Sequence, residues 1–200
     1  MKSLDALKTI DKLLKENNGV VRTADVVNAG LSRTTLGLLA KIGELERVAQ
    51  GQYIRPDDMP DELFLLQQRS NKIVFSHETA LFLHGMAERT PLKHSLTIPS
   101  NSKISSTLSK GCKIYYVKPD LHSFGQCSVI SMMGHEIIAY DAERTICDIL
   151  RSRNRVDNQT LAAAMKNYAV RKNQDWNKLR KYAAAFHITK LLRQYLEVLI

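Results

Sequence analysis

Residues 23–41 read TADVVNAGLSRTTLGLLAK, and this stretch decides the fold of the N-terminal part of the chain. Its first half predicts a short helix that ends at Gly30, because glycine tolerates the left-handed conformation at a helix C-terminus. Ser32 is a suitable N-terminal cap for a further helix that runs to about Lys41. Two short helices separated by a tight turn with glycine are typical of a helix-turn-helix.

The segments on either side complete a winged helix-turn-helix. Residues 4–14 carry apolar side chains at steps of three and four, which predicts an amphipathic helix ahead of the motif. Residues 45–55 hold strand-forming side chains on either side of Gly51, which predicts a hairpin, the wing. The turn-rich segment 56–60 ends this part of the chain. We therefore predict a winged helix-turn-helix DNA-binding domain over residues 1–56.

The remaining residues, 57–200, predict a small α+β domain with a helical C-terminal end. Helices are expected near 61–70 and after Ser76 and Asp141, and strands at 72–75, 95–98, 113–117, 129–132 and 135–140. No Gly or Pro occurs from Asn158 to the C-terminus, and the apolar spacing there predicts two or three helices. The fold class is thus α+β, with an α+β core to about residue 150 and a basic helical tail over 151–200.

Composition and charge narrow the class of function. The chain has 200 residues, 44% of them apolar, and a mean hydropathy of −0.24, as expected for a globular protein outside the membrane. No apolar run approaches membrane-spanning length and no export signal opens the chain, so we expect a cytoplasmic protein with no membrane partner. The net charge of +9 favours an anionic partner. Residues 1–55 carry +3, residues 56–150 carry −2 and residues 151–200 carry +8.

The second helix of a helix-turn-helix enters the major groove with its N-terminal residues leading. Arg33 stands at that end and has the geometry to donate two hydrogen bonds to a guanine edge. Gly37 in mid-helix costs about 1 kcal/mol relative to alanine, which indicates close approach of another surface, either the DNA groove or the first helix. The predicted DNA-binding residues are Ser32, Arg33, Thr34, Thr35 and Lys41 on the helix, and Arg47, Gln52, Tyr53 and Arg55 on the wing.

The basic tail is a possible second nucleic-acid surface. Its clustered cations are Arg151, Arg153, Arg155, Arg171, Lys172, Lys178, Arg180 and Lys181. Phosphate contacts from this surface would add to the affinity of the wing domain. The alternatives are a solvated helical face and a surface for RNA.

Three constellations that resemble active sites fail on spacing or context. His77 and His84 are seven residues apart, about 10 Å along a helix, whereas zinc-binding histidines on a helix are separated by four residues. Asp141, Glu143 and Asp148 suit helix capping as well as Mg²⁺, and no phosphate-binding glycine loop or Gly-x-Ser-x-Gly accompanies them. We predict that the chain is not an enzyme and has no catalytic residue, metal or cofactor.

The sequence resembles the AbiEi antitoxins of bacterial abortive-infection toxin–antitoxin systems. The resemblance rests on the helix-turn-helix with Leu31–Thr35 and the wing Val48–Tyr53, on Ser76–Gly85 (SHETALFLHG), and on Tyr140–Leu150 (YDAERTICDIL). It spans the chain to about residue 150.

This resemblance implies a type IV antitoxin that binds inverted repeats in its own promoter and represses transcription. The functional partner would be a nucleotidyltransferase-like toxin, countered by the second domain without a stable complex. An alternative function is an interaction protein that neutralises the toxin by direct binding. A third is a nuclease or nucleotide-modifying enzyme.

Overall fold

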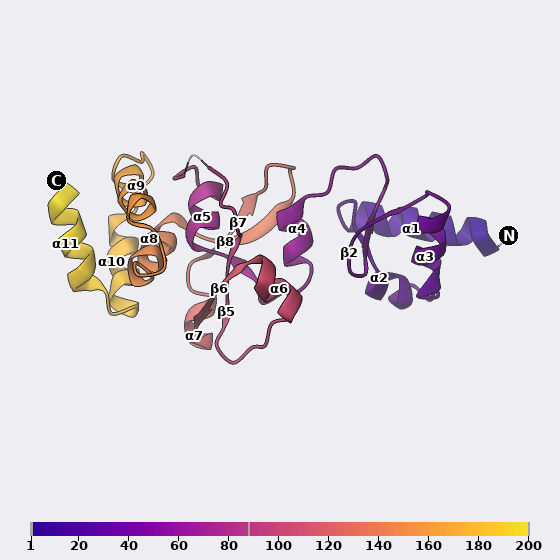
Figure 1. Cartoon of the computed structure of the whole chain (residues 1–200), viewed down its shortest axis with the longest axis horizontal. Coiled ribbons are helices and arrows are strands. Elements are labelled where there is room, and N and C mark those ends of the chain that lie inside the picture. Colours follow the sequence, from indigo (N-terminus) through magenta and orange to yellow (C-terminus); the bar gives the residue numbers. More distant parts are fainter. Residues whose placement is uncertain (1, 88, 200) are drawn as a thin grey trace. The chain divides into compact units, whose positions relative to one another are not determined.

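The chain forms two compact units in the computed structural model, which describes residues 2–87 and 89–199 (Figure 1). Unit 1 comprises the residues up to Arg69 together with 132–135, and unit 2 comprises Ser70–Ser131 and the residues from Glu136 onward. Unit 1 therefore extends beyond residue 56, where the sequence predicts the end of the first domain.

Unit 1 contains four helices and a three-stranded antiparallel sheet in its described residues. They are α1 (Lys2–Glu16), β1 (Val21–Arg22), α2 (Thr23–Asn28), α3 (Thr34–Lys41), β2 (Glu46–Ala49), β3 (Gln52–Ile54) and α4 (Glu62–Gln67). The strand order is β1-β3-β2, so β3 is the central strand. The predicted helices and hairpin are present, and β1 is a strand that the sequence analysis missed.

Local signals in the sequence set the turns of unit 1. Gly30 after α2 and Gly51 between β2 and β3 have φ of +79° and +70°, a region that glycine enters without steric cost. The core between the helices and the sheet is apolar, and its fully buried members are Ile10, Val21, Val26 and Leu36.

The segments outside the predicted first domain join unit 1 through polar contacts. Gln52 Nε2 donates to the Leu65 carbonyl at 3.0 Å, and Arg22 donates to the Gln68 side chain at 2.9 Å. The ring of His135 stacks on Phe64 with centroids 4.5 Å apart. These contacts make α4 and residues 132–135 part of the same compact unit.

Unit 2 is a five-stranded mixed sheet with helices, followed by a helical C-terminal end. Its elements are β4 (Val74–Phe75), α5 (His77–Leu83), β5 (Ser95–Pro99), α6 (Ser106–Gly111), β6 (Lys113–Val117), α7 (Pro119–His122), β7 (Gln126–Ile130), β8 (Glu136–Tyr140), α8 (Ala142–Arg151), α9 (Asn158–Ala169), α10 (Trp176–Ala185) and α11 (Thr189–Leu199). The strand order is β6-β5-β4-β8-β7. The α+β class and the helical end agree with the prediction, whereas the short helices α6 and α7 were not predicted.

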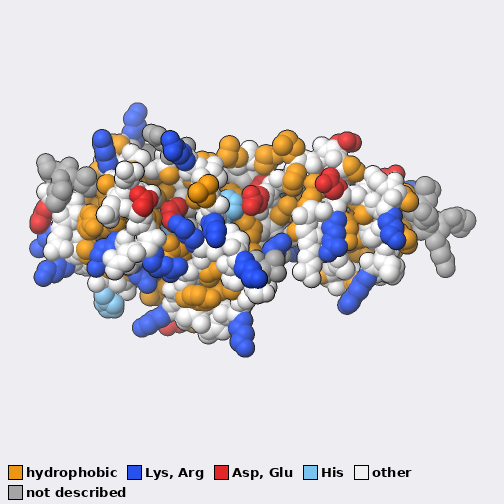
Figure 2. All heavy atoms as spheres, in the orientation of Figure 1, with side chains coloured by type: hydrophobic (Ala, Val, Ile, Leu, Met, Phe, Trp, Pro, Cys, Tyr) orange, Lys and Arg blue, Asp and Glu red, His pale blue; other side chains and the backbone are white. Residues whose placement is uncertain are grey.

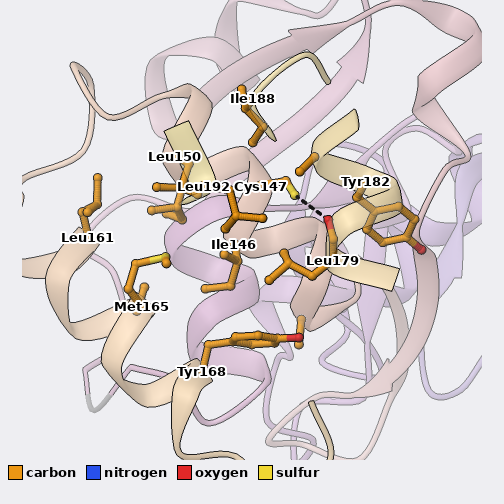
Figure 3. Packing of buried hydrophobic residues seen from close by; sticks show 14 of the residues in the cluster. Ile146, Cys147, Leu150, Leu161, Met165, Tyr168, Leu179, Tyr182, Ile188 and Leu192 are labelled. Carbon is orange, nitrogen blue, oxygen red and sulfur yellow. Dashed lines mark hydrogen bonds between the residues drawn. The ribbon is translucent and has the colours of Figure 1, made fainter. Parts of the chain in front are cut away.

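Helix α8 is the centre of the core of unit 2. All nine residues from Ala142 to Leu150 are buried. Figure 3 shows Ile146, Cys147 and Leu150 of α8 among apolar side chains of α9, α10 and α11. The Asp141 carboxylate accepts the Arg144 amide at 2.8 Å and so caps the helix as predicted. Within the described residues, no helix is both long and apolar enough to cross a membrane.

Candidate nucleic-acid interface

Ser32 fixes the start of α3. Its Oγ accepts the Thr34 amide at 3.3 Å, and its carbonyl accepts the Thr35 amide at 3.0 Å. Arg33 already has helical backbone angles, with φ −55° and ψ −30°. Ser32 therefore acts as the N-terminal cap, and Arg33 occupies the first turn.

The polar residues predicted for α3 lie on its outward side. Ser32, Arg33, Thr34 and Lys41 are exposed, and Thr35 is half-buried. In the part of the chain that the structure describes, neither Arg33 nor Lys41 forms an ion pair with an acidic side chain. Their charges are therefore available to an anionic ligand.

No described side chain or backbone segment around Gly37 requires a glycine there. A Cβ added at this position would meet no heavy atom within 4 Å among the described residues, outside the helix's own neighbouring backbone. The sequence left two surfaces open for this position, the DNA groove and the first helix. No described atom of α1 comes within 4 Å of that position, so the first helix does not account for the glycine, and contact with a DNA groove stays a prediction.

The wing differs from the prediction at three of its four residues. Arg47 is exposed, as expected for a phosphate contact. Gln52 and Tyr53 are only 3% and 9% exposed, because Tyr53 packs into the apolar core of unit 1 and the Gln52 side chain donates to the Leu65 carbonyl, so neither side chain is placed to contact DNA. Arg55 is held by Asp11 and by Glu44, whose carboxylate lies 3.1 Å from the guanidinium, so this cation is largely neutralised within unit 1.

Four of the predicted tail cations have partners inside unit 2. Arg151 pairs with Asp148 at 3.1 Å, and Lys178 pairs with Asp141 at 2.9 Å. Arg171 donates to the His84 carbonyl at 2.6 Å. Arg155 donates to the Ile114 carbonyl at 3.2 Å and lies over the Tyr115 ring, 4.2 Å from its centroid. These side chains contribute to the structure of the unit, which was not visible from their clustering in sequence.

The other four tail cations, Arg153, Lys172, Arg180 and Lys181, are exposed. Arg180 and Lys181 share one side of α10 with the exposed residues Asn177 and Ala184, at steps of three and four. Figure 2 shows Lys and Arg side chains spread over the C-terminal helices on the face drawn. The basic surface of the tail is therefore smaller than its net charge suggests, but it has an outward-facing part.

The two histidines that were considered for zinc each have other partners. The buried His77 ring contacts the Ser76 and Ser152 hydroxyls, both at 2.9 Å, and stacks on Tyr115. Burial, with Arg151 and other nearby cations, holds the pKa of His77 well below its usual value. His84 Nε2 lies 2.7 Å from the Tyr140 carbonyl.

The three acidic residues considered for Mg²⁺ are likewise occupied. Asp141 caps α8 and accepts the Tyr182 hydroxyl at 2.9 Å, and Glu143 accepts the Tyr168 hydroxyl at 3.1 Å. Asp148 pairs with the buried Arg144 at 3.0 Å. Among the described residues, no group of three or more His, Cys, Asp or Glu side chains is arranged to hold a metal ion.

Sequence reasoning missed two exposed apolar residues, one on α3 and one at its C-terminal cap. Leu38 is 60% exposed and Ile42 is 70% exposed. The signal was present, since both lie on the same side of the helix as Thr34, away from the buried Leu36 and Leu39.

Comparison with known proteins agrees with the predicted resemblance in the N-terminal part. Residues 8–56 match the model of the transcriptional regulator family of AbiEi antitoxins. The crystal structure of the RV2827C protein from Mycobacterium tuberculosis is similar in fold, with a TM-score of 0.62 and 13% identity over 90% of this chain and 71% of that one. No curated protein matches the chain. The N-terminus thus carries a domain of the AbiEi transcriptional-regulator type.

Proposed function

We propose that the chain is a non-enzymatic autorepressor and antitoxin, which binds inverted repeats in its own promoter through unit 1. The observation that carries the proposal is the capped start of α3, where Arg33 stands exposed and without an acidic partner among the described residues. The family match over residues 8–56 supports the same role.

The α3 residues have distinct roles in this proposal. Arg33 donates two hydrogen bonds to a guanine edge, because it leads the helix that enters the major groove. Ser32 and Thr34 offer short hydroxyl donors to phosphates or base edges. Lys41 at the far end of α3 and Arg47 on β2 contact the phosphate backbone.

Replacement of Arg33 separates base recognition from phosphate binding. Arg33→Ala should lose about 1–3 kcal/mol on a selected operator duplex and little on random DNA. Arg33→Lys is the matched control, since it keeps the charge but loses the two-pronged hydrogen-bonding geometry. It should bind random DNA as tightly as the wild type but lose operator preference as Arg33→Ala does. Equal losses on both duplexes for Arg33→Ala would show that this residue only holds phosphate.

For unit 2 we propose the antitoxin role, directed against a nucleotidyltransferase-like toxin and exerted without a stable complex. The alternative is direct neutralisation of the toxin by binding. Co-purification of the co-expressed toxin at moderate salt distinguishes them: a stoichiometric complex supports direct neutralisation, and protection of cells without a complex supports the first mechanism.

We further propose that the exposed tail cations add phosphate contacts to those of unit 1. Arg180 and Lys181 on one side of α10, with Lys172 ahead of the helix, are exposed and form no ion pair among the described residues. Each phosphate that they neutralise would steepen the salt dependence of DNA binding.

A further inference from the structure

Helix α3 and its C-cap residue Ile42 present two apolar side chains that the core of unit 1 does not use. Leu36 and Leu39 already bury the inward side of the helix. Leu38 and Ile42 lie one turn apart on the outward side, and more than half of each side chain is exposed. One exposed apolar residue needs no explanation, but two in succession on a helix proposed to enter DNA do.

The surroundings of Leu38 are those of a DNA-reading surface. Thr34 and Lys41 are exposed and share the side of Leu38, at steps of four and three residues, and Arg33 is exposed at the leading end of the helix. Gly37 beside Leu38 carries no side chain, and the space above it is open. A bound duplex would therefore meet a cation at each end and an apolar side chain in between.

We infer that Leu38 recognises the C5-methyl group of a thymine in the major groove, an inference that rests on the proposed DNA binding by unit 1. Thymine is the base that offers a methyl group there, and apolar side chains are its usual contacts. Leu38 lies five residues beyond Arg33, about 7.5 Å along the helix axis. Since base pairs are about 3.4 Å apart, we expect the thymine about two base pairs from the one that Arg33 reads.

A second copy of the chain is the other occupant to consider for an exposed apolar pair. In a two-fold symmetric contact through this side of α3, each copy would present the same patch to the other. That arrangement would bring Arg33 and Lys41 of one copy near Arg33 and Lys41 of the second copy. The contact would be unfavourable because like charges repel. Phosphates, in contrast, complement both cations. The charges around Leu38 therefore favour DNA over self-association.

The test compares thymine with deoxyuridine, which lacks only the C5-methyl group. The probe is the duplex that the full chain selects from a pool of random-sequence DNA, resynthesised with deoxyuridine at one thymine at a time. Wild-type protein should lose about fourfold in affinity at one or two positions, the effect of burying one methyl group. Leu38→Ala should bind the unmodified duplex more weakly and show no further loss at those positions.

Ile42→Ala is the matched control, because Ile42 is exposed on the same side but lies one turn further from the leading end of α3. It should retain the sensitivity to deoxyuridine. Wild-type binding that is indifferent to every deoxyuridine, or a Leu38→Ala variant that remains sensitive, overturns the inference and leaves the proposed DNA binding intact. A change in sedimentation of the DNA-free protein on Leu38→Ala, without a change in methyl sensitivity, assigns the surface to a second copy. If no duplex is selected at all, the proposed function fails and this inference with it.

Discussion

Gly37→Ala should stabilise unit 1 and weaken its binding to DNA. Alanine is favoured over glycine by about 1 kcal/mol inside a helix, and the added methyl group meets nothing within 4 Å in the free protein. In the proposed complex the same methyl group lies between α3 and the groove. Overpacking of a close contact typically costs about 1–3 kcal/mol, so the operator affinity should fall by about 5- to 150-fold.

The two effects are measured on separate observables. Amide hydrogen exchange in α1 and α3 reports the stability of unit 1. Trp176, the one tryptophan of the chain, lies in unit 2, so its unfolding transition is an internal control that should not move. Gly111→Ala is the matched variant, because it adds a methyl group in open space in unit 2 and should leave DNA binding unchanged. Slower exchange in α3 with unchanged operator affinity would refute the reasoning, since it would mean that no surface approaches Gly37.

Two further predictions concern unit 2. Replacing Lys172, Arg180 and Lys181 by Gln should reduce the slope of log K against log salt for operator binding by at least about one unit. The same change at the exposed Lys103, Lys110 and Lys118 should not, and identical slopes with both variants would leave the tail no part in DNA binding. Unit 2 should also lose stability as the pH falls below about 6.5, by up to about 1.4 kcal/mol per pH unit for each buried histidine. The sign follows because burial holds the pKa of His77 below its ordinary value, so the unfolded chain takes up a proton that the folded chain does not. Unfolding in guanidinium chloride, followed by Trp176 fluorescence at several pH values, measures this loss of stability. The variant His77→Asn, whose side chain tolerates the positive φ at this position, should show a weaker dependence of stability on pH. An equal pH dependence in both proteins would exclude His77 as the cause.

Features with a local cause were accessible from the sequence. Gly30, Ser32 and Gly51 each act on a turn or a helix end within a few residues, and each was assigned correctly. The same holds for Asp141, whose carboxylate caps the helix that follows it directly. The order of helices and hairpin in unit 1 follows from such signals, together with the apolar spacing of α1.

Features that depend on distant partners were not accessible. Gln52 and Tyr53 were assigned to DNA because they lie on the wing, but Tyr53 packs into a core that helices α1 to α3 contribute to, and Gln52 bonds to Leu65 of α4. Arg55 is neutralised by Asp11, which lies 44 residues away in sequence. Arg171 bonds to the carbonyl of His84, 87 residues away. No local pattern predicts such contacts, so sequence alone overstates how many cations can meet DNA.

The number of exposed cations in unit 1 limits the salt dependence that its DNA binding can show. With Arg55 paired to acidic side chains, Arg33, Lys41 and Arg47 are the predicted cations still exposed on α3 and the wing. Because Arg33 is proposed to read a base, Lys41 and Arg47 are the phosphate contacts of one copy; they give a salt slope of about 2, and two copies on an inverted repeat give about 4. A slope well above about 4 therefore cannot come from these residues alone. The exposed tail cations Arg153, Lys172, Arg180 and Lys181, which form no ion pair among the described residues, are candidates for the extra contacts, as are the exposed Lys8 and Lys15 of α1. A slope that falls when Lys172, Arg180 and Lys181 are replaced by Gln would assign the contacts to the basic tail and give it a role in promoter binding separate from its antitoxin role.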